Sequence, residues 1–336
     1  MPLVKTQTGK SLHMTIDRIE GLRKTLWPEG MPGYRRVFAV LDGAKDTAVF
    51  GAVDASRQDK TCLYSVNPRW LPADLAWNVV GIAPYLIELD PDEKSTNSLL
   101  RKAWEGNWGI FLRTAASIEA LRRHLRHFLT AYTESGKMLM FRFYDPRVFR
   151  VYLPTCTPDE LRIFFGPISA FIAPSRNPDR ALRFCLSGTE LVEEVQALAD
   201  NRPFLPIEPG LEPVPRSQKP IRVTVRNSQM ARFRQTRMQD FENRMLEHVS
   251  RFFAGRFNRA GEQRIRELIQ EGIGRAAKYG FRTEQEICRF IDLMVVFGPR
   301  FDQDADWAAR VLLCPGQGNR LEQLLAAATA HLRMAG

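Results

Sequence analysis

The chain has 336 residues, a formal net charge of +10 and a pI of about 9.6. Hydrophobic residues make up 44% and charged residues 26%, which excludes a chain that is disordered throughout. No apolar run reaches the roughly 18–20 residues of a membrane-spanning helix, and the N-terminus lacks the apolar centre of a signal peptide. We therefore expect a cytoplasmic protein.

The cysteines give no sign of a disulfide framework or a zinc site. They are odd in number and form no CxxC pair, which favours reduced, mostly buried thiols. Their positions are Cys62, Cys156, Cys185, Cys288 and Cys314.

Short apolar runs bounded by turn residues predict buried strands at Val37–Leu41, Ala48–Val53 and Tyr85–Leu89. Ser117 then has the position of an N-cap, and the apolar stripe that follows it predicts a helix ending near Gly136. These elements predict a mixed α/β lobe with a short-stranded sheet and flanking helices.

The same lobe continues with a strand predicted over Met138–Tyr144. Thr157 and Glu160 have capping-box spacing around Pro158, so a helix should run to Phe165 and stop at Gly166. Further strands are expected at Phe171 and Leu182–Leu186.

A proline-rich stretch predicts an extended linker, because proline cannot donate to a helix or a central strand. Its prolines are Pro203, Pro206, Pro209, Pro213, Pro215 and Pro220. We expect an α/β domain over residues 1–200, a linker over residues 201–220 and a basic helical domain over residues 221–336.

After the linker, Ile221–Val225 is a candidate strand and the remaining pattern is helical. Thr283 and Glu286 form a second capping-box pair, and Gly298 fits the end of that helix. Two more helices are expected, one starting near Asp306 and a last one over about Leu321–Leu332.

The sequence contains none of four common catalytic or nucleotide-binding motifs: the GxSxG elbow, the P-loop, HExxH and GxGxxG. We therefore expect neither an enzyme nor a cofactor. His124 and His127 could share a helix flank, but three arginines surround them and no carboxylate or cysteine is near in sequence. A partly exposed basic helix face is the favoured interpretation of this pair.

The segment Phe141–Phe149 is the most informative for function. An arginine inside an apolar strand is costly unless a carboxylate meets it, so Arg142 should be largely buried and paired, with Asp145 as first choice and Asp42 as second. This pair is either structural or part of a groove for a partner, and the structural role is favoured.

Several short segments, in order over residues 37–170, resemble the type VI secretion effector-chaperone (adaptor) family. They include Val40–Ala44 (VLDGA), Trp108–Leu112 (WGIFL) and Arg142–Val148 (RFYDPRV), and the others are Ala83–Leu89 (APYLIEL), His124–Arg126 (HLR) and Phe165–Ile168 (FGPI). The resemblance implies a protein that binds and stabilises a toxin effector and helps load it onto the secretion spike. It implies no catalysis and no cofactor. The candidate structural or partner-binding residues are Asp42, Arg126, Arg142, Tyr144, Asp145 and Arg147.

Two other functions stay open. Residues 216–336 contain 21 Lys and Arg against 13 Asp and Glu, which would suit a nucleic-acid-binding lobe, although no such motif is present. An enzyme with an unrecognised site would use Asp42, His124, Arg142 and Asp145. The candidate basic surface is formed by Arg232, Arg234, Arg237 and Arg244.

Overall fold

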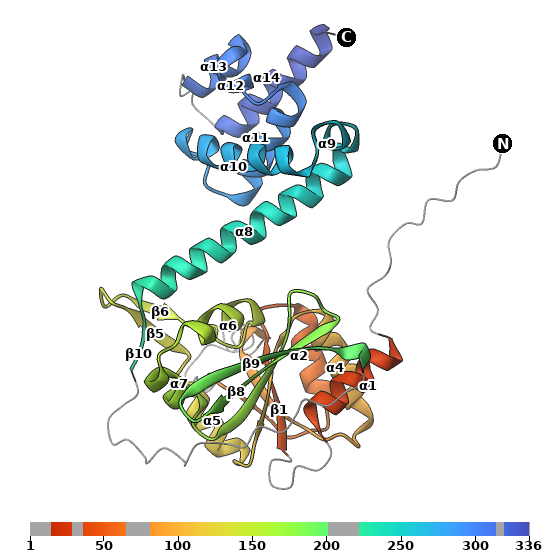
Figure 1. The fold of residues 1–336 in the computed structure, drawn as a ribbon, viewed down its shortest axis with the longest axis vertical. Coiled ribbons are helices and arrows are strands. Elements are labelled where there is room, and N and C mark those ends of the chain that lie inside the picture. Colours follow the sequence, from red (N-terminus) through yellow and green to blue (C-terminus); the bar gives the residue numbers. More distant parts are fainter. Residues whose placement is uncertain (1–14, 29–35, 65–80, 201–221, 314–318, 336) are drawn as a thin grey trace, which may run out of the picture. The chain divides into compact units, whose positions relative to one another are not determined.

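The computed structural model describes residues 15–28, 36–64, 81–200, 222–313 and 319–335. It divides the chain into two compact units, Met1–Phe233 and Arg234–Gly336. The first unit combines sheets and helices and the second is helical, which confirms the predicted fold class (Figure 1). The predicted linker, residues 201–220, lies outside the described residues, so the domain limits drawn from the sequence stay a prediction.

A seven-stranded antiparallel sheet forms the centre of the first unit, in the order β2-β3-β1-β4-β7-β8-β9. Its strands are β1 (Arg36–Asp42), β2 (Lys60–Cys62), β3 (Pro84–Leu89), β4 (Gly109–Thr114), β7 (Ile168–Pro174), β8 (Arg180–Ser187) and β9 (Glu190–Ala197). The central strands are buried on both faces, which explains why their sequences are continuous apolar runs.

Helices cover both faces of this sheet. Alternate residues of β1 separate the two cores: Phe38 and Val40 face one, and Val37 and Ala39 face the other. The first core is covered by α5 (Ile118–Arg126), α6 (Pro146–Tyr152), the short helix η2 (Leu153–Thr155) and α7 (Pro158–Phe165). The second is covered by α1 (Ile16–Leu26), α2 (Thr47–Ala55), α4 (Lys94–Glu105) and the short helix η3 (Leu198–Asp200).

A second, three-stranded sheet in the order β10-β5-β6 adjoins the first core. β5 (Thr130–Thr133) pairs in parallel with β10 (Val223–Val225) and antiparallel with β6 (Met138–Met140). β10 therefore belongs to the first unit, although the sequence places it in the second domain. Arg226 directly follows β10 and forms an ion pair with Glu160 at 3.1 Å, which ties the end of β10 to α7.

Three predicted elements of this unit are wrong in type or extent. The strand predicted over Met138–Tyr144 ends at Met140, because a turn follows it before α6 begins at Pro146. Ala48–Val53 lies in α2 rather than in a strand, because Asp46 caps a helix there by accepting a hydrogen bond from the Ala48 N–H at 2.9 Å. The helix after Ser117 ends at Arg126, not near Gly136. Gly136 instead sits in the β5–β6 turn with φ +83°, where glycine has no steric penalty.

The second unit contains most of α8 (Asn227–Phe252), a helix that begins in the first unit. Its other helices are α9 (Ala254–Ala260), α10 (Glu262–Lys278), α11 (Glu284–Phe297), α12 (Phe301–Asp304), α13 (Asp306–Leu313) and α14 (Arg320–Ala335). Gly272 allows α10 to pack closely on α11, since a Cβ there would lie 2.7 Å from Cγ1 of Ile291. Among the helices described, none is long and apolar enough to span a bilayer.

Candidate partner-binding site

The candidate residues of the first unit gather around the end of β1. Asp42 is the last residue of this strand, and its side chain is 2% exposed. Its backbone N–H donates to the Trp108 carbonyl at 2.8 Å, which fixes the strand end against the residue preceding β4. One carboxylate oxygen accepts a hydrogen bond from the Ala44 N–H at 3.1 Å. Asp42 therefore places a negative charge at a rigid and nearly buried position.

Arg142 forms an ion pair with Asp42 and not with Asp145, so the first-choice partner was wrong and the second is the one found. The Arg142 side chain is also 36% exposed rather than largely buried. The reason is that β6 ends at Met140, and residues 141–144 form a turn in which the Asp145 N–H donates to the Arg142 carbonyl at 3.0 Å. The guanidinium thus reaches the end of β1 from a half-exposed turn.

Asp145 has a local role as the N-cap of α6. Its side chain accepts a hydrogen bond from the Arg147 N–H at 2.9 Å and pairs with the Arg147 guanidinium at 2.6 Å. Burial by itself would raise the pKa of Asp145, but the side-chain and backbone hydrogen bonds from Arg147 outweigh it and lower that pKa. Asp145 is therefore held ionised, while Arg147 remains 59% exposed.

Tyr144 lies between Arg142 and Asp145 in the sequence and contacts a second group of residues, which leads to β6. Its ring is buried against Phe143, and burial raises the pKa of its hydroxyl, which also hydrogen-bonds with Tyr64. The Tyr64 hydroxyl in turn lies 3.7 Å from the sulfur of Met140. A series of contacts thus runs from Tyr144 through Tyr64 to Met140 of β6.

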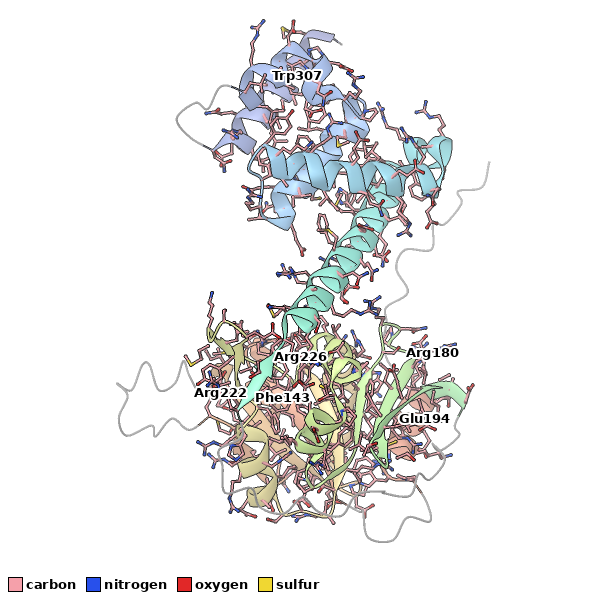
Figure 2. All side chains as sticks on the ribbon, turned by 60° about the vertical axis from the view of Figure 1, so that its left-hand side comes forward. Phe143, Arg180, Glu194, Arg222, Arg226 and Trp307 are labelled. Atoms are coloured by element: carbon pink, nitrogen blue, oxygen red, sulfur yellow. The ribbon has the colours of Figure 1, made fainter. Side chains whose placement is uncertain are left out.

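β6 presents two methionines that the sequence reading did not single out. Met138 is 67% exposed and Met140 is 71% exposed, and they alternate with Leu139, which is half-buried. They occupy an outer strand of the three-stranded sheet. Arg222, which is labelled in Figure 2, directly precedes β10 of the same sheet. Its guanidinium lies over the Tyr132 ring of β5 at 4.4 Å. The period-two pattern Met-Leu-Met was visible in the sequence, but which face is open depends on sheet pairing.

The other candidate residues lie elsewhere. Arg126 is half-buried on α5. Burial raises the pKa of the nearby Cys62 thiol, and the charge of Arg126 opposes this only in part. His124 is half-buried, with its Nε2 2.9 Å from the Phe164 carbonyl oxygen, while Arg123 and His127 beside it are exposed. Burial lowers the pKa of His124.

The candidate basic surface lies along α8. Its four members are exposed side chains of one helix, and Arg244 pairs with Glu284 of α11 at 2.6 Å. Arg232 belongs to the first unit and the others to the second. The four are Arg232, Arg234, Arg237 and Arg244.

Comparison with known proteins finds a match to a family profile that covers part of the first unit. Residues 37–162 match the family profile described as "Domain of unknown function (DUF4123)". No curated protein and no solved structure matches the chain. The matched segment runs from β1 into α7 and contains Asp42, Arg142 and Arg147, together with the exposed methionines of β6.

Proposed function

We propose that this protein is a type VI secretion effector chaperone, or adaptor, which binds a toxin effector in the producing cell and helps load it onto the secretion spike. The single observation that carries the proposal is the match of residues 37–162 to the DUF4123 profile, which covers all the segments that resemble the adaptor family except Phe165–Ile168. The protein acts by binding and performs no chemistry of its own.

Four exposed or half-exposed side chains, Met138, Met140, Arg142 and Arg147, support a binding role and are called the β6 surface below. Methionine side chains are flexible and polarizable, so they adapt to irregular apolar partners. Arginine and methionine are both enriched at protein interfaces. The occupant that fits this surface is an effector segment with apolar side chains and at least one carboxylate.

Apolar burial should supply most of the affinity. Covering one methionine side chain contributes about 1.5–3 kcal/mol, whereas an exposed ion pair contributes about 0–1 kcal/mol. Arg142 and Arg147 would then mainly orient the effector segment and contribute little to its affinity. A chaperone of this kind also covers apolar effector surface that would otherwise promote aggregation before export.

Co-expression with any toxin whose gene neighbours this one tests the proposal. The two proteins should elute together in size-exclusion chromatography at both 50 and 200 mM salt, because apolar contacts resist salt and phosphate contacts do not. The variant Met138→Glu/Met140→Glu should release the effector. Val195→Glu is the matched control, since Val195 is 54% exposed on the outer strand β9 and lies away from β6.

Two outcomes would contradict the proposal. Failure of the parent protein to bind the toxin, together with salt-sensitive binding of duplex DNA, would favour a nucleic-acid-binding protein instead. Equal loss of effector by the β6 variant and the β9 control would show that the β6 surface is not the binding site.

A further inference from the structure

Three side chains with metal-binding atoms meet in the second unit. His248 lies on α8, and Cys288 and Asp292 lie one turn apart on α11. Their ligand atoms are all within 4.8 Å of one another, and Nε2 of His248 is 2.7 Å from Oδ1 of Asp292. Residues spaced by four project from the same face of a helix, so α11 directs its thiol and its carboxylate toward the same imidazole.

We propose that His248, Cys288 and Asp292 form a site for a divalent transition metal ion, with Zn²⁺ as the best fit. A thiolate, an imidazole and a carboxylate are the donors that zinc takes. Metal–ligand bonds of about 2.0–2.3 Å in a tetrahedral site place the donors roughly 3.3–3.7 Å apart. To reach this geometry, His248 and Asp292 must move slightly apart and Cys288 must move slightly closer to them.

The charges of the site favour a divalent ion. With the Cys288 thiol proton released to solvent, the thiolate and the Asp292 carboxylate carry two negative charges, which a 2+ ion neutralises. The neighbourhood is apolar, with the Phe252 ring 4.9 Å and the Phe253 ring 6.1 Å from the His248 ring. A neutral metal site suits such surroundings better than two separate anions do.

The position is also accessible. His248 is 26% exposed and Asp292 is 13% exposed, so an ion can enter and a water molecule can complete four ligands. Arg289 lies 3.6 Å from the second oxygen of Asp292 and is the cation that a metal would displace. Its side chain is 53% exposed and can turn into solvent. The metal would join α8 to α11 and thereby stabilise the second unit.

Cobalt provides a direct probe of the site, because Co²⁺ occupies zinc sites and a thiolate ligand gives it a charge-transfer absorption band. Chelator-treated full-length protein should bind one equivalent of Co²⁺ with this band, and Zn²⁺ should remove it. The band should be absent in Cys288→Ser and retained in Cys62→Ser, which changes another half-buried thiol. Zn²⁺ should raise the Tm of the parent and leave that of Cys288→Ser unchanged.

Absence of a thiolate band in the parent, or its persistence in Cys288→Ser, would overturn the proposal. Circular dichroism of the metal-free variants shows whether they fold. If Cys288→Ser does not fold, Asp292→Asn keeps the size of the side chain and should weaken Co²⁺ binding at least tenfold. Unchanged binding by a folded Asp292→Asn variant would equally refute the site.

Discussion

Replacing Arg142 with alanine tests how much the ion pair at the end of β1 stabilises the first unit. Asp42 is 2% exposed, and the substitution leaves its carboxylate with the Ala44 N–H but without its cation. Removing one partner of a fully buried pair costs about 3–5 kcal/mol, and an exposed pair is worth about 0–1 kcal/mol. Because Arg142 is 36% exposed, water can partly replace it, and we expect a loss of about 1–3 kcal/mol.

Urea unfolding followed by tryptophan fluorescence measures this loss. Five of the six tryptophans precede residue 109, so the signal reports mainly on the first unit. Arg162→Ala is the matched control in that unit, because Arg162 and Asp159 form an exposed pair at 3.3 Å and its removal should change stability by less than about 1 kcal/mol. Asp42→Asn completes a double-mutant cycle with Arg142→Ala.

The cycle separates the pair from other effects of either substitution. Strictly additive losses would show that Arg142 and Asp42 do not stabilise each other, and the structural role assigned to the pair would be wrong. A variant that unfolds like the parent but no longer holds the effector would leave Arg142 with a role in binding alone.

Further predictions concern helix ends and one histidine. Thr157→Ala and Thr283→Ala each remove a capping-box hydrogen bond and should lower the free energy of unfolding by about 0.5–2 kcal/mol in urea titrations, with Thr→Ser at the same sites nearly neutral. Gly166→Ala should cost about 1–3 kcal/mol, because Gly166 has φ +50° and the new Cβ would meet the His124 ring. The folded-state pKa of His124 lies below its unfolded value, because burial disfavours the charged imidazole. The contribution of neutral His124 to the free energy of unfolding is therefore complete above about pH 6.5. It is lost as the pH falls below that value, by at most about 1.4 kcal/mol per pH unit. The variant His124→Gln should flatten this slope, and an equal slope in parent and variant would assign it to other groups.

Local signals in the sequence predicted the helix ends well. Both capping boxes, at Thr157 and at Thr283, are present as predicted, because a cap depends on residues within one turn of each other. The predicted end of the helix after Ser117 failed for the opposite reason. Thr130–Thr133 continues the apolar stripe but pairs with β6 and with β10, which is some ninety residues away in sequence, and this pairing outweighs helix periodicity.

The two candidate sites also bring together residues that are far apart in the sequence. Arg142 and Asp42 are separated by 100 residues, and sequence proximity made Asp145 the more obvious partner. Asp145 proved to be occupied as a helix cap, a role that its position before Pro146 could have suggested. The group His248, Cys288 and Asp292 has no motif spacing across α8 and α11, so no pattern in the chain could have identified it.

The pairing of β10 with β5 predicts how much of the chain is needed to bind an effector. The family match ends at residue 162 and the predicted first domain at residue 200, yet Val223 and Val225 are buried in the core beneath the β5–β6 hairpin. Removing them exposes that core at a cost of about 1.5–3 kcal/mol for each valine and leaves β5 without one neighbour. A chain truncated after residue 200 should therefore melt at a lower temperature and bind the effector weakly, whereas one truncated after residue 233 should retain both properties. Thermal unfolding and co-elution of the two truncated chains measure this difference, and equal binding by both would show that β10 does not support the β6 surface.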